Sequence, residues 1–556
     1  MADSADRYDR RAFLARGATT AAAVGLAGVG LPSLLAACGS GSPTTPHASS
    51  TPGIGIGAPK RGGTVTIGLN SEIDGFLPST SHFDNSGLTY ANTLFDTLTV
   101  VAADGSAKPY LASSVVPNSD MTAWTITLRS GVTFHDGSPL NADVLVANLQ
   151  ALQASALTGQ ALRGVVDSVA KVPGNDLAVT VTCAEPIVAF PQYLATQVGY
   201  VIGMAQLESQ STTKPIGTGP FSLVEWVPND HLTVTRNPHY WRSGLPYLDG
   251  LTYRPISEDQ SRENSLRSAT IDLMVTRDPN AIRDLRGNAD YQLVLNPTVG
   301  QGDMDFVILN TSVDPTSDIV VRQALAHAIN VDELVKLFGA GIAKPNLSLF
   351  PPGSPYRPAD NGYPTYDLAK AKQLVAQAAP NHGGTIKIAL ATITDPRLLN
   401  EVQAIASMWG LAGIQTTVSE IEQVTFIDNL VTGQFQAYTD EMFGATDPDL
   451  NYVWLSPTTA NGAIALNFAR NKDDALETAL QQGRTMSDQA VRVKAYQEVD
   501  KRLAQDLPYL WASLATWCSI GSDVVQNFNN LTLPDGSKAL GFSNGILDPT
   551  PMWRKD

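Results

Sequence analysis

Several kinds of residue are scarce in this chain of 556 residues, and each shortage excludes a class of protein. The three cysteines are too few for a fold built on a disulfide framework. The seven histidines form no His-x-x-x-His pair and no HExxH motif, so neither a metal site nor any other cofactor is expected. Basic residues number 37 against 53 acidic ones, a formal net charge of −16, which argues against nucleic acid as a partner.

Long hydrophobic runs are also scarce, and the one near the N-terminus is typical of an export signal. The pair RR at positions 10–11 precedes an uncharged run over residues 17–35, and the sequence LLAAC then ends at Cys38. This order predicts a twin-arginine signal peptide over residues 1–37, with a lipobox whose Cys38 carries lipid after cleavage. An ordinary hydrophobic helix with a chance cysteine is the alternative. No later segment holds the ~20 unbroken apolar residues that a membrane span needs.

Residues 38–61 are rich in Gly, Ser, Thr and Pro, a composition that cannot bury a core and is typical of a flexible tether. The globular body is therefore expected to begin near residue 62. Lipid on Cys38 would hold it at the extracytoplasmic face of the cell membrane. In such an oxidising compartment Cys183 and Cys518 could pair, but both lie in apolar or alternating runs, which favours two separate buried thiols.

Strand and helix patterns alternate along the body. Residues 64–69 alternate like a strand, and so do Trp124, Ile126 and Leu128 in WTITL. Apolar residues at helical spacing dominate later stretches such as VVRQALAHAINVDELVKLF and SDQAVRVKAYQEVDKRLAQD. Interleaved strands and helices predict α/β layers rather than a helical bundle or a β-sandwich.

The stretch VTFHDGSPLNADVL contains the pair His135-Asp136, which could act as a proton-transfer dyad. The sequence DGSP at 136–139 is typical of a turn, and no serine or cysteine partner stands nearby. Asn141 is a suitable helix N-cap. The stretch therefore predicts a hairpin turn followed by a capped helix, and the chain is not expected to be an enzyme.

Six stretches, taken in order, carry a resemblance to one family. They include LFDTLTVVAADGSAKPYLASSV, WTITLRSGVTFHDGSPLNADVL, PIGTGPFSLVEWVPNDHLTVTRNPHYW and NTSVDPTSDIVVRQALAHAINVDELV. The last two are PTYDLAKAKQLVAQA and ALQQGRTMSDQAVRVKAYQEVDKRLAQDLPYLW. The six stretches lie between residues 94 and 511, and the chain from residue 62 to about 530 resembles the extracytoplasmic solute-binding proteins of family 5, which serve peptide, oligopeptide and nickel ABC importers.

The resemblance implies a class II periplasmic-binding-protein-like α/β fold of three lobes with a hinged ligand cleft. Lobe I would combine residues 62–86, 200–310 and 512–556, lobe II would be 87–199, and lobe III would be 311–511. Lobe III would close over the ligand through a hinge of two crossing strands.

The resemblance also implies ligand contacts in two places. Glu72 follows the first strand where relatives line the pocket, although a solvated strand-end glutamate is the alternative. In MFGATDPDLNYVW, where Phe443 replaces the usual Trp, Asp447 is the first candidate to hold a ligand cation and Asp449 the second. A turn-capping role before proline is the alternative for Asp447. The other candidates for the pocket wall are Phe443, Tyr452 and Trp454, although such aromatic residues are often core residues.

Dipeptide-binding relatives place an arginine after a third-lobe strand to hold the ligand carboxylate. That position falls near Thr392 in LATITDPR, where no arginine stands, and Arg397 comes five residues later, where a helix is expected to have begun. The missing arginine counts against a strict dipeptide binder. It leaves longer peptides or a non-peptide solute.

The sequence thus predicts a monomeric, lipid-anchored substrate-binding component of an ABC importer, with a membrane permease as partner and a peptide or another small polar solute as ligand. The alternative is an interaction or regulatory lipoprotein of the cell envelope that has lost transport. A cleft filled by side chains would favour this alternative, and an open cavity of peptide size would count against it.

Overall fold

A computed structural model describes residues 57–556 apart from 156–157, 163, 297–301 and 463–464. These residues belong to one compact unit, 51–556. The predicted signal peptide, Cys38 and most of the predicted tether lie outside the described residues. Within the described part, every helix is too short or too polar to cross a bilayer.

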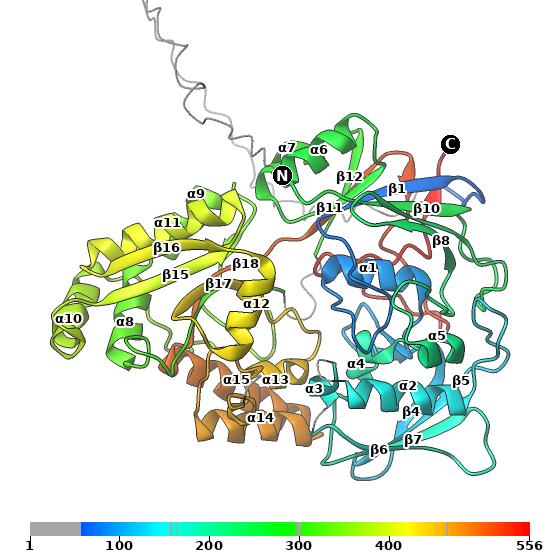
Figure 1. Ribbon diagram of the computed structural model, residues 1–556, viewed down its shortest axis with the longest axis horizontal. Helices are drawn as coiled ribbons and strands as arrows, with labels where there is room; N and C mark the ends of the chain where they lie inside the picture. The colour runs from blue at the N-terminus through cyan, green and yellow to red at the C-terminus, as the bar shows by residue number, and fades with distance from the viewer. Residues whose placement is uncertain (1–56, 156–157, 163, 297–301, 463–464) are drawn as a thin grey trace, which may run out of the picture. The chain divides into compact units, whose positions relative to one another are not determined.

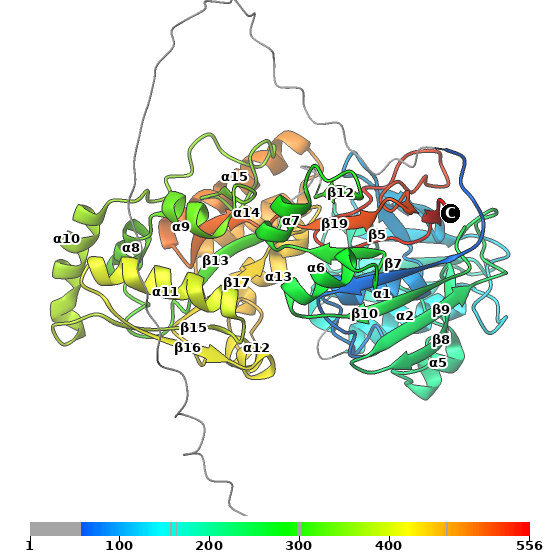
Figure 2. The same ribbon diagram turned by 90° about the horizontal axis from the view of Figure 1, so that it is seen from above.

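The first sheet has seven strands in the order β12-β19-β11-β1-β10-β9-β8. Its central strand β1 runs parallel to β10 and β11, and the outer pairs are antiparallel. Figure 2 shows β10, β9 and β8 side by side in this order. The strands are β1 (Thr64–Leu69), β8 (Phe221–Val227), β9 (His231–Arg236), β10 (Gly250–Pro255), β11 (Leu273–Thr276), β12 (Tyr291–Leu295) and β19 (Cys518–Ser522). The helices joined to it are α1 (Asn85–Leu94), α5 (Met204–Ser209), α6 (Asp259–Arg267) and α7 (Pro279–Leu285).

The second sheet is antiparallel, with four strands in the order β4-β5-β7-β6. In β5, Trp124, Ile126 and Leu128 are buried and their neighbours are not, as the alternation predicts. The strands are β4 (Ala112–Pro117), β5 (Ala123–Leu128), β6 (Val166–Lys171) and β7 (Ala178–Cys183). The helical elements of this segment are α2 (Ala142–Ala154), α3 (Gly159–Leu162), α4 (Phe190–Tyr193) and the 3₁₀ turn η1 (Gln197–Gly199).

The stretch around His135 is a turn followed by a capped helix, as predicted. Gly137 has φ +83°, and the Asp136 carboxylate accepts hydrogen bonds from the backbone N–H and the hydroxyl of Ser138. The Asn141 side chain caps α2 by accepting from the backbone N–H of Val144 at 3.1 Å. His135 Nδ1 accepts from a backbone N–H, which gives this ring a structural role, and burial lowers its pKa.

The third sheet has six strands in the order β14-β18-β13-β17-β15-β16 and lies between two layers of helices. Its strands are β13 (Met304–Leu309), β14 (Lys344–Pro345), β15 (Lys387–Ile393), β16 (Gln415–Ile421), β17 (Ala437–Met442) and β18 (Tyr509–Leu514). One face packs against α8 (Ile319–Ala328), α9 (Val331–Phe338), α10 (Leu368–Ala378) and α11 (Pro396–Leu411). The other packs against α12 (Gln423–Thr432), α13 (Tyr452–Leu455), α14 (Asp474–Thr485) and α15 (Gln489–Asp506). In Figure 1, α9 and α11 lie above this sheet and α14 and α15 below it.

Short elements complete the fold. They are the strand pairs β2 (Thr99–Val101) with β3 (Ala107–Pro109) and β20 (Val525–Gln526) with β21 (Trp553–Arg554). The remaining 3₁₀ turns are η2 (Ala379–His382), η3 (Pro448–Asn451) and η4 (Pro457–Thr459). Cys183 and Cys518 are both buried and free, which confirms two separate thiols.

The chain passes between the first and third sheets twice, once between β12 and β13 and once through residues 515–517 between β18 and β19. β19 pairs with β12 in the first sheet, and β18 pairs with β13 in the third, so both connections run between neighbouring strands of the two sheets. Predicted lobe I includes residues 304–310 and 512–514, whose strands β13 and β18 pair in the third sheet. The lobe boundaries themselves stay a prediction.

Candidate functional site

A cavity of about 1540 Å³, here called the cleft, lies between the ends of the first and third sheets. One wall comes from residues between 70 and 85, from the start of α6 and from the start of α7. The other wall comes from the ends of β13, β17 and β18, together with α11 and α12. Pockets for drug-sized ligands usually have volumes of about 300–1,000 Å³, so the cleft has room for a larger solute.

Three of the six predicted ligand contacts line the cleft, namely Glu72, Phe443 and Trp454. The Glu72 carboxylate is already engaged. It accepts from Trp226 Nε1 at 2.9 Å and from the backbone N–H of Asn229 at 2.8 Å. These bonds tie the loop after β1 to the turn between β8 and β9, so Glu72 holds the wall together from within.

Asp447 and Asp449 are turned toward arginines of the same chain, and neither lines the cleft. Asp447 is 8% exposed, accepts from Arg492 Nη2 at 2.8 and 3.0 Å, and caps η3 through the backbone N–H of Asp449. Asp449 is fully buried and accepts from Arg484 Nε at 2.8 Å and from the Tyr193 hydroxyl at 3.2 Å. Each carboxylate therefore has an internal cation. Their role in ligand binding stays a prediction.

Aromatic rings form part of the cleft wall. Phe443 has φ +77°, a region that bulky residues rarely adopt, and its ring is buried. Its centroid lies 5.5 Å from Phe306, 5.1 Å from Tyr509 and 5.9 Å from Trp511. The packing of this cluster holds the strained backbone in place, and strained residues are often found at binding sites.

The two remaining predicted aromatics differ in position. The Trp454 ring lies in the cleft wall, 5.4 Å from the ring of Phe468. Tyr452 lies behind the wall, where the Arg484 guanidinium stands 3.5 Å from its ring centroid and its hydroxyl donates to Glu477. Tyr452 therefore acts in packing in this structure.

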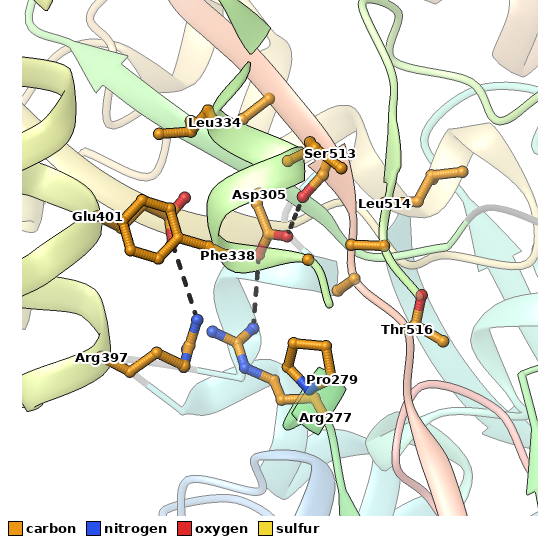
Figure 3. A pocket seen from close by; sticks show the side chains of 15 residues that line it. Arg277, Pro279, Asp305, Leu334, Phe338, Arg397, Glu401, Ser513, Leu514 and Thr516 are labelled. Carbon is orange, nitrogen blue, oxygen red and sulfur yellow. Dashed lines mark hydrogen bonds and ion pairs between the residues drawn. The ribbon is translucent and has the colours of Figure 1, made fainter. Parts of the chain in front are cut away.

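Charged side chains gather beside residues 515–517, and of these the sequence patterns pointed only to Arg397. Figure 3 shows Arg277, Arg397, Asp305 and Glu401 around a small cavity of about 50 Å³, and all four also line the cleft. Arg277 lies 3.6 Å from Asp305 and contacts Glu441, and Arg397 lies 3.8 Å from Glu401. Arg277 thus joins the end of β11 to β13 and β17, whereas Arg397 and Glu401 pair with each other on α11.

The local sequence gives little indication that Arg277 or Arg397 lies in the cleft. Thr392, where relatives place an arginine, is fully buried in β15. Arg397 belongs instead to the first turn of α11, where Asp395 caps the helix by accepting from the Arg397 backbone N–H at 2.7 Å. Arg277 follows the buried strand β11 directly, a place where cleft residues often lie in α/β folds.

Carboxyl groups outnumber guanidinium groups at this end of the cleft. Burial raises the pKa of Asp303 to about 6 and that of Asp440 to about 7. Burial, together with the charge of Asp305, raises the pKa of Glu401 to about 7. With Asp305 and Glu441, five carboxyl groups face the two arginines, so the site can accommodate added positive charge.

One catalytic pattern, G-x-S-x-G, occurs at residues 541–545 as GFSNG. In hydrolases this pattern forms a nucleophile elbow between a strand and a helix. Here Ser543 and Ile546 form an isolated bridge across a turn, and the chain continues without a helix to its last residues. This described segment lacks the helix that must follow the serine in a nucleophile elbow, so the pattern does not indicate a hydrolase.

Residues 106–463 match the family model of the bacterial extracellular solute-binding proteins, family 5. The glutathione-binding protein GsiB of Salmonella typhi is 31% identical over 300 residues, which are 53% of this chain and 57% of GsiB. That alignment thus spans little more than half of the relative.

Two solved structures share the fold. The periplasmic binding protein DppA from Helicobacter pylori, in complex with the peptide STSA, superposes with a TM-score of 0.78 at 21% identity, covering 89% of this chain and 99% of DppA. The binding protein AgaA from A. tumefaciens R10, in complex with agropinic acid, gives 0.77 at 23% identity, with 89% and 99% covered. These likenesses confirm the predicted periplasmic-binding-protein-like α/β fold.

Proposed function

We propose that this chain, which belongs to the bacterial extracellular solute-binding proteins of family 5, captures peptides or related polar solutes in the cleft and delivers them to an ABC permease. The cavity of about 1540 Å³ between the ends of two sheets is the observation that carries the proposal. Two connections between neighbouring strands join those sheets, which suits a hinge, so a solute that touches both walls would favour a closed form. The ligands named for GsiB, DppA and AgaA suggest peptides and related solutes as the first to test.

Ligand binding is expected to stabilise the protein against heat. A ligand that binds the folded state at 100 times its Kd adds about 2.7 kcal/mol to the free energy of unfolding. Thermal unfolding is measured with glutathione, the peptide STSA and a broad peptide library, with maltose as control, and native mass spectrometry looks for a retained ligand. If the peptide library does not raise the unfolding temperature and no ligand is retained, the proposal that the protein captures peptides is wrong.

A lipid anchor at Cys38 is the second part of the proposal. It is supported by the twin arginines at 10–11 and by LLAAC, and it would keep the binding protein near its permease. Replacing Cys38 with serine is expected to move the protein from the membrane fraction to the soluble extracytoplasmic fraction. The fractions are compared by immunoblot. An unchanged membrane fraction would count against lipidation.

The alternative of an interaction lipoprotein without transport expects a cleft filled by side chains. The cavity argues against it. The internal pairing of Asp447 and Asp449 does not favour it either, because both lie outside the cleft and leave its walls free.

A further inference from the structure

Among the described residues of the cleft, one carboxylate has a buried oxygen without a hydrogen-bond partner. Asp440 lies on β17, and its side chain lines the cleft. Its Oδ1 accepts from the backbone N–H of Glu441 at 2.9 Å. Its Oδ2 is buried and has no hydrogen-bond partner among the described residues. A buried carboxylate oxygen without a donor is costly, so such an atom points to a partner that comes from outside the chain.

The neighbouring carboxylates in the cleft already have partners. Asp305 accepts from the Ser513 hydroxyl at 2.6 Å and lies near Arg277. Trp517 Nε1 donates to both Asp303 and Glu441. Farther along the wall, Glu401 forms an ion pair with Arg397 at 3.8 Å. The remaining carboxylates accept from arginine, histidine, serine, tryptophan or backbone N–H donors; they are Glu72, Asp74, Asp84, Glu258, Asp259, Asp278 and Asp395. Asp440 is therefore distinguished from the other acidic residues of the cleft by its unpaired buried oxygen.

The surroundings of Asp440 suit an organic cation. Asp440 is paired in register with Phe306 on β13, and Phe306 is paired with Trp511 on β18. All three residues line the cleft, so a carboxylate and two aromatic rings form one row across the sheet. A carboxylate gives an ammonium or guanidinium group a charge-assisted hydrogen bond, and neighbouring ring faces attract the same charge.

Apolar side chains stand at the mouth of the same cleft. Val424 and Ile427 on α12 line it and are 65% and 41% exposed. Exposed apolar residues on a cavity wall suit a ligand that carries apolar groups beside its charge. The cleft therefore offers one acidic contact and one apolar contact on the third-sheet side.

We propose that the Asp440 carboxylate binds a positively charged group of the transported solute, so that the cleft selects peptides or related solutes that carry an ammonium or guanidinium group beside apolar groups. This assignment rests on the proposed function. Asp440 would be the residue that determines this preference, and Phe306 and Trp511 would flank the bound cation.

The test uses the mature protein and four peptides based on Leu-Lys-Leu. The amino terminus is free or acetylated, and the central residue is lysine or norleucine, so that one member lacks any cation. Titration calorimetry is expected to show at least one cationic member binding about ten-fold or more tightly than the neutral member, since a hydrogen bond to a charged group contributes about 1.5–3 kcal/mol. Asp440→Asn is expected to remove that preference and to leave the affinity for the neutral member within about two-fold.

Two controls separate this assignment from general electrostatics and from misfolding. Asp74→Asn removes a charge from the same cleft at a carboxylate that already pairs with His82, and it is expected to leave the preference unchanged. Asp440→Ser, a smaller polar replacement, is expected to match Asp440→Asn, and both variants should unfold at or above the wild-type temperature.

A second readout is proton release. Burial raises the pKa of Asp440 to about 7, and the positive charge of Arg277 opposes part of this rise. A cation that ionises Asp440 at pH 7 therefore releases about 0.5 proton. The release is measured in two buffers of different ionisation enthalpy, and Asp440→Asn is expected to abolish it.

Each outcome has a distinct meaning. Equal affinity for cationic and neutral members, or an equal loss for both in Asp440→Asn, overturns the assignment of Asp440 and leaves peptide capture intact. A preference that disappears equally in Asp74→Asn also overturns it. Failure of all four peptides, together with the absence of any thermal shift in the library, overturns peptide capture itself and this assignment with it.

Discussion

Replacing Arg484 with methionine is expected to lower the free energy of unfolding by about 3–5 kcal/mol, because it leaves the Asp449 carboxylate buried without its cation. The guanidinium donates to Asp449 at 2.8 Å and to the Tyr193 hydroxyl at 3.2 Å, and it lies 3.5 Å from the Tyr452 ring centroid. Methionine keeps most of the aliphatic stem but supplies no charge and no donor. The penalty is therefore mainly the isolated buried charge.

The measurement is urea unfolding followed by tryptophan fluorescence, with the slope of the transition checked against wild type. Arg283→Met, at an exposed arginine that pairs with exposed Asp284, is the matched control and should leave stability unchanged within error. Changing both partners, Asp449→Leu with Arg484→Met, is expected to restore part of the loss, because Asp449 is then no longer a buried charge without its cation. If the free energy of unfolding of Arg484→Met alone lies within about 1 kcal/mol of the wild-type value, water or a rearranged side chain must satisfy Asp449.

The same pair joins segments far apart in sequence. The backbone N–H of Val188 donates to the carbonyl of Arg484 at 3.1 Å, and the Tyr193 hydroxyl donates to the carbonyl of Asp449 at 3.1 Å. Tyr193 belongs to α4, next to the second sheet, whereas Arg484 belongs to α14 under the third sheet. Loss of Arg484 is therefore expected to loosen this junction and to weaken ligand binding as well.

The ligand-free protein is expected to be more stable at pH 6.5 than at pH 8, by about 2 kcal/mol. Burial raises the pKa of Asp96, Asp440 and Glu401 to about 7, far above the usual value for a carboxyl group. Between their unfolded and folded pKa values the folded protein holds protons that the unfolded chain releases. Stability therefore falls as the pH rises through 7, and each of the three groups contributes somewhat less than about 1 kcal/mol over this interval.

Urea unfolding at both pH values tests the pH dependence. Asp440→Asn and Glu401→Gln remove one titrating group each, and each is expected to shrink the pH difference by about a third. Asp74→Asn, at an exposed carboxylate, should leave it unchanged. His135 opposes this trend, most strongly below pH 6.5, because burial lowers its pKa, so the comparison stops there. Equal stability at the two pH values would mean that these carboxyls are ionised in the folded protein.

The sequence by itself determined the elements and the family. Alternation in 64–69 and in WTITL predicted β1 and β5, and DGSP with Asn141 predicted the turn and the cap of α2. The order of six motifs led to the family, and the family implied the cleft. These inferences succeed because alternation, helix capping and turn formation depend on residues within a few positions of one another.

The charges of the site were decided only by the tertiary structure. The motif pointed to Asp447, yet its partner Arg492 lies 45 residues away, and Asp449 meets Tyr193 from 256 residues away. Among the described residues, the cleft carboxylate with an unpaired buried oxygen is Asp440, which local sequence does not distinguish from Glu441 beside it. Whether a carboxylate meets an arginine, a tryptophan or a ligand depends on which helices and strands pack around it. That arrangement results from burial over the whole chain and leaves no local pattern.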